Sequence, residues 1–447
     1  MKLIPGFINR HIAHRPNLVK IVDNIGWLFF DKILRMGVGL IVGVWIARYL
    51  GPEQFGLLSF ATAFVGLFSA IAVLGLHGIA VRDIVRNPEG ARETLGTAAI
   101  LQLVGGIVSY LLILAVIAYL RPDDPLARSI IAILGSMMLL KASEIAVYWF
   151  ESQVQSKWTV WVQNSVFLVF AAVKVVLILQ EASLTAFVWA ILGEAVVVAV
   201  ILLFVLGKRG PVLSSFRANA GRAKTLLKDS WPLLLSGMVL MVQARIDQIM
   251  IGQMVGDIEV GYYSVALRII ETAAVTAMIL HSSFFPSIIS AKKTSEKLYL
   301  ERLEFFYKLN VVISLPIAVP IAIFSPWIIS VLFGEDYMPA ALIMSIMAIR
   351  LFFAHIGVPR GIYLLSENLL KFSALTMVVG TVINITLNYF MIPIYLGVGA
   401  TIASLVSFFV TIFLIDLFYS KTRSNAVMMM RSIFTSFTIF RKKSWAL

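Results

Sequence analysis

Apolar runs of about 20 residues recur along the whole chain, and they limit its possible folds more than any other feature. Each run is long enough to cross the roughly 30 Å hydrocarbon core of a bilayer as an α-helix. The runs are nearly continuous and do not alternate polar with apolar residues, which favours helices over an outer-membrane barrel. The sequence therefore predicts an all-α integral membrane protein with twelve spans, at residues 25–49, 56–80, 95–119, 128–150, 158–180, 184–206, 231–255, 261–285, 309–332, 340–362, 371–391 and 397–419.

The composition supports a membrane protein and excludes a soluble enzyme. Of the 447 residues, 60% are hydrophobic and 14% are charged. A soluble domain is usually about half apolar and about a quarter charged. The chain is also too apolar to be disordered. Because it has no cysteine, disulfides, thiolate catalysis and cysteine-ligated metal sites are excluded, and no metal site is predicted.

Lysine and arginine are unevenly divided between the two sets of predicted connections. Suppose that the N-terminal segment and every second connection lie on one side of the membrane. That side then holds 27 of the 37 Lys and Arg, including Arg360, while the other side holds three and the spans hold seven. Such an excess marks cytoplasmic loops, so both termini are predicted to be cytoplasmic. The net charge of +13 is then explained by loops that face anionic lipid, without a nucleic acid partner.

The predicted spans and connections divide the chain into five parts. A cytoplasmic or interfacial segment, residues 1–24, has no signal-peptide cleavage site and precedes an N-lobe of six spans, residues 25–206. A basic cytoplasmic linker, residues 207–230, leads to a C-lobe of six spans, residues 231–419. In the basic tail, residues 420–447, an apolar stretch is too short to cross a bilayer and predicts an interfacial helix.

The two predicted lobes share a motif at the same topological place. Residues 51–61 follow the first span, and residues 256–266 follow the seventh at an offset of 205 residues. A turn of the type Gly-x-x-x-x-Gly is common, but matched positions in both lobes indicate a duplication. Six spans per copy give both copies the same orientation, which predicts parallel repeats about a pseudo-two-fold axis and a central cavity between the lobes. The residues in register are Gly51, Gly56, Ser59 and Ala61 with Gly256, Gly261, Ser264 and Ala266.

The same segments resemble those of a known family. Residues 47–56 are similar to the first outer turn of the polysaccharide-biosynthesis exporters, and residues 247–252 with 261–264 are similar to their seventh-to-eighth-span junction. This family comprises flippases of lipid-linked O-antigen or capsule repeat units. It lies within the multidrug/oligosaccharidyl-lipid/polysaccharide exporter superfamily. The motif residues are turn and packing positions that perform no chemistry: Gly51, Pro52, Gly56, Gly256, Gly261, Tyr263 and Ser264.

The resemblance implies an alternating-access flippase of a bacterial inner membrane. Its substrate would be an undecaprenyl-diphosphate-linked glycan, moved from the cytoplasmic to the outer leaflet during polysaccharide or lipopolysaccharide biosynthesis. Membrane lipids and a glycan polymerase or chain-length machinery would be its partners, and H⁺ or Na⁺ coupling would replace a bound cofactor. The sequence has no phosphate-binding glycine loop and no His-Glu-x-x-His pair, so neither ATP hydrolysis nor enzymatic activity is expected.

Two other functions remain open. An ion-coupled multidrug exporter of the same superfamily would need acids in its cavity more than arginines. A membrane glycan polymerase or ligase would need a sizeable external loop with catalytic groups. The short predicted outer connections speak against that enzyme.

Ionisable residues within the predicted spans are the candidate functional residues. Each costs several kcal/mol in hydrocarbon unless it faces a cavity or a partner. Three couples lie one turn apart and can neutralise themselves, or they can contact substrate: Asp31 with Arg35, Lys141 with Glu144, and Arg268 with Glu271.

Four basic residues are predicted to line a cationic cavity. Arginine donates bidentate hydrogen bonds to phosphate oxygens, so it suits the diphosphate that the resemblance implies. Pairing with an acid from another helix is the alternative. The four are Arg35, Arg245, Arg350 and, near an outer end, Lys174.

Two acids are candidates for ion coupling. Glu194 and Asp247 have no obvious partner on the same helix face, so each could carry a proton or sodium ion or could neutralise a basic residue. His281 and His355 could titrate near neutral pH, but a lone histidine in a span is more often a hydrogen-bonded structural residue.

Overall fold

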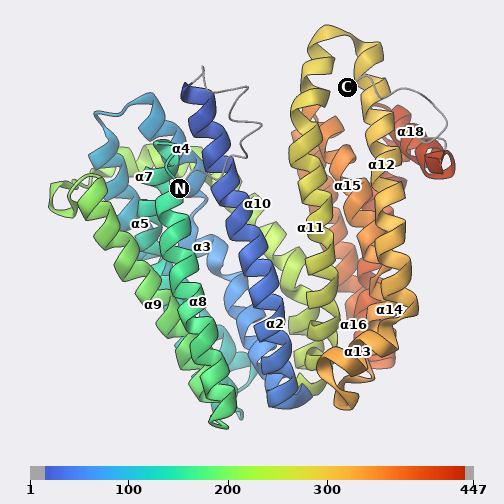
Figure 1. Ribbon diagram of the computed structural model, residues 1–447, viewed down its shortest axis with the longest axis horizontal. Helices are drawn as coiled ribbons and strands as arrows, with labels where there is room; N and C mark the ends of the chain where they lie inside the picture. The colour runs from blue at the N-terminus through green and yellow to red at the C-terminus, as the bar shows by residue number, and fades with distance from the viewer. Residues whose placement is uncertain (1–15, 438–447) are drawn as a thin grey trace. The chain divides into compact units, whose positions relative to one another are not determined.

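The computed structural model describes residues 16–437, and every regular element in that range is a helix (Figure 1). The predicted all-helical fold is confirmed. Ten helical stretches among the described residues are long and apolar enough to cross a membrane. The first helix begins at Pro16, so most of the predicted segment 1–24 lies outside the described residues.

Contacts between residues divide the chain into two compact units. Unit 1 comprises the chain up to Leu50 together with Phe60–Arg245, and unit 2 comprises Gly51–Ser59 together with the chain from Ile246 onward. The division therefore falls within helices and not in the connection between residues 207 and 230. The lobe boundaries expected from the sequence stay a prediction.

Unit 1 is built mainly from the helices of the first half of the chain. Its apolar core gathers around Leu76, Tyr148 and Phe150, all with an exposed fraction of 1% or less. Two of its helices, the first and the last, continue into unit 2. The helices are α2 (Pro16–Leu67), α3 (Ser69–Val73), α4 (Leu76–Arg86), α5 (Ala91–Leu120), α6 (Pro125–Gly135), η1 (Ser136–Glu144), α7 (Ile145–Ser152), α8 (Lys157–Leu179), α9 (Leu184–Arg209), η2 (Leu213–Ser215) and α10 (Ala220–Met254).

Unit 2 has its own core, in which Phe306, Tyr307 and Met429 are fully or almost fully buried. The helix that holds Met429 is the one that the apolar stretch of the tail predicts. Its interfacial position stays a prediction. The helices are α11 (Asp257–Thr294), α12 (Glu296–Ile323), α13 (Ser325–Phe333), η3 (Glu335–Tyr337), α14 (Ala340–Met347), α15 (Ile349–Ser366), α16 (Leu370–Phe409), η4 (Val410–Leu414), α17 (Ile415–Phe418) and α18 (Arg423–Phe434).

Two of the ten membrane-length stretches are much longer than one bilayer crossing requires. Gly26–Arg86 has 61 residues and Leu370–Phe418 has 49. At 1.5 Å per residue these would measure about 90 Å and about 75 Å if straight. Each contains a residue with non-helical backbone angles, Gly51 with φ 72° and Leu396 with φ 55°. The chain therefore changes direction within both stretches.

Three connections differ from those expected. Residues 292–308 are helical and not a loop, because α11 and α12 continue until they meet at Ser295, and the two helices lie side by side (Figure 1). The connection between α9 and α10 spans residues 210–219 and is shorter than the predicted linker 207–230. The predicted span 309–332 is interrupted at Phe324, between α12 and α13. Proline disfavours a helical residue before it and has no N–H to donate, so Pro326 is tolerated only in the first turn of a new helix, which begins at Ser325.

The matched glycines of residues 51–56 and 256–261 serve two purposes. Gly51 and Gly256 adopt φ of 72° and 105°, which residues with a Cβ rarely adopt, so each permits a sharp turn between helices. Gly56 and Gly261 lie where backbones cross within unit 2. A Cβ on Gly56 would lie 1.8 Å from the carbonyl oxygen of Asp257, and a Cβ on Gly261 would lie 2.2 Å from that of Pro52.

This crossing is reciprocal. Asp257 is the counterpart of Pro52 at the offset of 205 residues, just as Gly261 is the counterpart of Gly56. Gly56 therefore packs against Asp257, and Gly261 packs against Pro52, so matched residues of the two segments make matched contacts. Phe55 and Tyr262 cover the crossing by packing edge-on against Tyr337, and burial raises the pKa of that phenol so that it stays neutral.

Candidate functional site

A buried polar site in unit 2 is centred on Asp247, which is 5% exposed and lies on α10. Three neutral groups donate hydrogen bonds to its carboxylate. The Tyr263 hydroxyl from α11 lies 2.7 Å from Oδ2, the Ser404 hydroxyl from α16 lies 2.6 Å from Oδ2, and the Asn388 amide from α16 lies 2.7 Å from Oδ1. No basic side chain among the described residues forms an ion pair with Asp247.

A second layer of amides supports this site. The Asn384 amide donates to the Ser404 hydroxyl at 3.1 Å, and the Asn388 amide also lies 3.4 Å from the Asn384 carbonyl oxygen. The Asn388 carbonyl oxygen, Oδ1, is buried and has no hydrogen-bond partner. Carboxylate and amide oxygens are the types of ligand that hard cations prefer. The described residues contain no cluster of three or more His, Cys, Asp or Glu side chains that could hold a metal ion.

Arg350 is the second notable charge of unit 2. It is the second residue of α15, is partly buried, and forms no ion pair among the described residues. Its guanidinium lies 5.3 Å from the ring centroid of Phe408, a cation–π distance.

Arg245 lies two residues before Asp247 on α10 and is partly buried. Two residues correspond to about 200° of helix rotation, so the two side chains leave α10 on different faces.

Three candidate charges of unit 1, Arg35, Lys174 and Glu194, form ion pairs within that unit. Arg35 donates to Asp31 at 2.8 Å and lies over the ring of Phe167 at 5.4 Å. Lys174 on α8 forms a 2.7 Å ion pair with Glu194 on α9. The sequence placed Lys174 among the cavity cations and Glu194 among the ion-coupling acids, whereas the structure makes each the partner of the other.

Other pairs follow the expected local pattern. Lys141 and Glu144 form a 2.7 Å ion pair within η1. His355 is fully buried, and its ring nitrogens lie 2.8 Å from the Leu351 carbonyl oxygen and 3.0 Å from the Thr276 hydroxyl, as in a structural histidine. His281 stacks against Phe285.

A polar cluster in unit 1 was missed from the sequence. His77 on α4 lies 2.6 Å from the Glu151 carboxylate on α7, and both side chains are about half exposed. The His77 ring stacks on Tyr148, whose hydroxyl accepts a 2.7 Å hydrogen bond from Gln102. The signal available in the sequence was a histidine within an otherwise apolar run, but its partner lies 74 residues away.

A buried ion pair in unit 2 was also missed. Arg360 donates two hydrogen bonds to Asp416, at 2.8 and 2.9 Å, and Asp416 is fully buried. Arg360 was counted among the loop charges of the predicted cytoplasmic side, and its placement in a loop is wrong. The residue lies within α15 and is 9% exposed, because the carboxylate from α17 neutralises it inside the unit.

Comparison with known proteins places this helical architecture in a family. Residues 21–291 match the model of the family described as "Polysaccharide biosynthesis protein". The chain is 22% identical to the probable low-salt glycan biosynthesis flippase Agl15 of Haloferax volcanii, over 85% of this chain and 79% of that protein. It is 21% identical to a putative O-antigen transporter of Shigella flexneri, over 86% of this chain and 94% of that protein.

Solved structures agree on the fold. The lipid II flippase MurJ in an inward closed conformation superposes with a TM-score of 0.73, at 15% identity, over 94% of this chain and 93% of that one. The match of the family model covers more than half of the 447 residues and includes both copies of the glycine motif. The chain therefore belongs to the polysaccharide biosynthesis protein family of multi-pass membrane proteins.

Proposed function

We propose that this protein is a flippase that carries lipid-linked oligosaccharide repeat units across the membrane. The observation that carries the proposal is the family match over residues 21–291 in a chain whose described helices include ten of membrane length. Relatives named as a glycan flippase and an O-antigen transporter align over about 85% of the chain, so the likeness extends well beyond one motif. The protein acts as a transporter and not as an enzyme.

The finer architecture that we propose is twelve spans in two six-helix lobes related by a pseudo-two-fold axis. Dividing Gly26–Arg86 and Leu370–Phe418 at their non-helical residues turns the ten membrane-length stretches into twelve. The reciprocal crossing of Gly56 and Gly261 supports the duplication. In this arrangement residues 25–206 and 231–419 form the lobes, both termini are cytoplasmic, and the protein lies in a bacterial inner membrane.

Arg350 is the residue that we propose to bind the diphosphate of the substrate. Its guanidinium has no carboxylate partner among the described residues, so phosphate oxygens need not displace one. Arg35 and Lys174 already have carboxylate partners at 2.8 and 2.7 Å, so a phosphate would compete with Asp31 and Glu194 there. Arg245 stays a candidate at a separate face of α10.

Asp247 is the residue that we propose to bind the coupling proton or Na⁺. Three neutral donors stabilise its charge, and no basic side chain pairs with it among the described residues. The carboxylate and the unpaired Asn388 oxygen are therefore available to a cation. Glu194 is less suited, because the Lys174 ammonium already neutralises it. A gradient of the coupling ion would supply the free energy for flipping an undecaprenyl-diphosphate-linked glycan towards a glycan polymerase on the outer side.

A flipping assay on Arg350 variants tests the proposal. Loss of a bidentate contact to phosphate removes about 1.5–3 kcal/mol, which predicts a rate at least about tenfold lower in Arg350→Gln. Arg350→Lys keeps the charge and is expected to retain an intermediate rate. Arg431→Gln, an exposed arginine of α18, is the matched control.

The readout is the amount of lipid-linked glycan that reaches the outer leaflet in cells lacking their own flippase. The proposed role of Arg350 is wrong if Arg350→Gln flips at the wild-type rate at equal expression. The proposed function itself is wrong if the wild-type chain delivers no glycan and instead protects cells from cationic drugs.

A further inference from the structure

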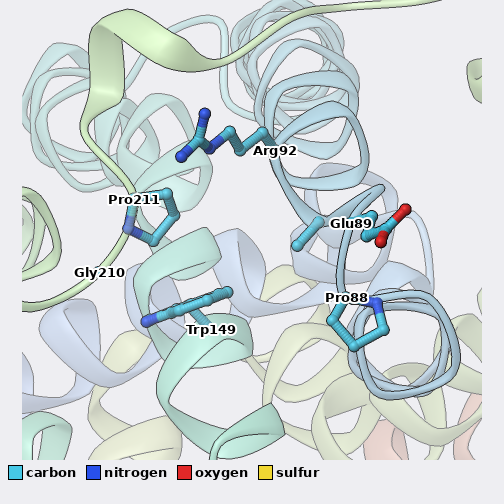
Figure 2. A pocket seen from close by; sticks show the side chains of 7 residues that line it. Pro88, Glu89, Arg92, Trp149, Gly210 and Pro211 are labelled. Carbon is cyan, nitrogen blue, oxygen red and sulfur yellow. The ribbon is translucent and has the colours of Figure 1, made fainter.

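A pocket of about 360 Å³ opens in unit 1 where α5, α7 and the chain after α9 approach one another (Figure 2). Arg92 and Glu89 lie at the start of α5, Trp149 belongs to α7, and Gly210 and Pro211 follow α9. The indole of Trp149 packs directly on Gly210, where a Cβ would lie 2.7 Å from the indole nitrogen. The pocket is therefore formed by main chain and an aromatic ring as well as by charged side chains.

The lining of this pocket includes one basic and one acidic side chain, Arg92 and Glu89, and a second arginine, Arg209, lies beside it in sequence. Arg92 is exposed, forms no ion pair among the described residues, and extends over the pocket towards Pro211 (Figure 2). The Glu89 carboxylate points to the opposite side of the first turn of α5 (Figure 2). Arg209, next to Gly210, lies 3.9 Å from the ring centroid of Trp158 and also lacks a carboxylate partner in the described chain.

The pocket lies at the ends of two helices that are longer than one bilayer crossing. α5 has 30 residues and α9 has 26, about 45 Å and about 39 Å at 1.5 Å per residue. Both exceed the roughly 30 Å hydrocarbon core, so at least one end of each helix extends beyond it, and the pocket lies at the first turn of α5 and just after the last turn of α9. Val85, Val212 and Leu213, which lie close in sequence to the lining residues, are between 41% and 58% exposed, as suits contact with acyl chains.

We infer that this pocket binds the phosphate headgroup of an anionic membrane lipid. In this proposal the Arg92 guanidinium donates hydrogen bonds to the phosphate oxygens. The rings of Trp149 and Trp158 lie at the level of the ester region of the lipid. The acyl chains run along the exposed side chains of Val85, Val212 and Leu213. Free inorganic phosphate shares the recognised chemistry but would not use those apolar residues. The site is separate from Asp247 and Arg350 and does not depend on the proposed transport.

Native mass spectrometry of the full-length protein, titrated with phosphatidylglycerol or phosphatidylcholine, tests the inference. The wild type is expected to retain phosphatidylglycerol preferentially. One basic residue near a membrane surface contributes about 1 kcal/mol, so Arg92→Gln should weaken phosphatidylglycerol binding about fivefold. Arg86→Gln is the matched control, because Arg86 is equally exposed and unpaired in the described chain but lies outside the pocket.

A second variant tests the pocket and not only its charge. Gly210→Val forces the Trp149 indole to move while every charge is kept, and it should reduce binding as much as Arg92→Gln does. Equal losses in Arg92→Gln and Arg86→Gln would mean that phosphatidylglycerol responds to diffuse charge, and would overturn the site. Binding of inorganic phosphate without any preference between the two lipids would assign a soluble ligand and overturn the lipid.

Discussion

A carboxylate that accepts three hydrogen bonds from neutral donors can stay charged without a basic partner. Asp247 is in this position, since Tyr263, Asn388 and Ser404 surround it and no ammonium or guanidinium pairs with it in the described chain. The coupling role that we propose for Asp247 rests on this absence of a basic partner. Glu194 differs, because the Lys174 ammonium forms a 2.7 Å ion pair with its carboxylate.

Replacing Asp247 by asparagine should uncouple transport from the ion gradient. The substitution keeps the size of the side chain but removes the charge that a proton or Na⁺ would neutralise. Flipping by Asp247→Asn should no longer accelerate when a pH or Na⁺ gradient is imposed on vesicles, whereas Glu194→Gln should still respond. An unchanged gradient response in Asp247→Asn would rule out its coupling role.

Replacing Asp416 alone should destabilise unit 2 strongly. Asp416→Asn leaves the Arg360 guanidinium buried without a counter-charge, which costs about 3–5 kcal/mol. The double variant Arg360→Met with Asp416→Leu should restore most of the lost stability, because no charge then remains buried. Glu304→Gln, which breaks the more exposed pair with Lys308, should cost less than about 1 kcal/mol.

The midpoint of thermal unfolding in detergent measures all three variants. A double variant that is no more stable than Asp416→Asn would contradict this account, since the cost would then come from lost packing and not from an isolated charge.

At the scale of helices, much of the fold followed from local sequence. An apolar run of about 20 residues predicts its own span, and couples such as Asp31 with Arg35 need only one turn of helix. The partners of Asp247 could not be predicted in this way. Asn388 and Ser404 lie 141 and 157 residues further along the chain, and neutral side chains in a span give no signal of what they contact.

The separation of partners along the sequence also explains the error at Arg360, whose partner Asp416 lies 56 residues away. Its position near the end of a predicted span suggested a loop, and only the packing of α15 against the end of the last span shows that Asp416 neutralises it. The continuation of α11 and α12 through residues 292–308 was hidden for a different reason. Charged residues end an apolar run, but they do not end a helix.

Adding a methyl group at the glycine crossing should disturb unit 2. In Gly56→Ala or Gly261→Ala the new Cβ meets backbone oxygen at about 2 Å, so α2 and α11 must move apart. Such overpacking costs about 1–3 kcal/mol. The controls are Gly66→Ala on α2 and Gly361→Ala on α15, because a Cβ at either position meets nothing within 4 Å.

Thermal unfolding again gives the measurement. Both crossing variants should melt at a lower temperature than the wild type. Both controls should have a free energy of unfolding within about 1 kcal/mol of the wild type, since alanine favours a helix over glycine. Equal stability of Gly56→Ala and the wild type would show that the backbones do not touch as the structure describes.

For the whole molecule, the absence of cysteine makes the predicted topology directly measurable. A single cysteine at any position is then the only thiol. In intact cells a membrane-impermeant maleimide should label Asp123→Cys, in the connection between α5 and α6, on the outer side. Ser214→Cys, between α9 and α10, should be labelled only after the membrane is opened. The opposite pattern would reverse the orientation inferred from the Lys and Arg distribution.

The reciprocal packing of Gly56 against Asp257 and of Gly261 against Pro52 also bears on the history of the chain. In the duplication that we propose, the two copies would change independently over most of their length. At this contact, however, a side chain gained at either glycine collides with the backbone of the other segment. A substitution at Gly56 or Gly261 is therefore acceptable only if the other segment changes as well.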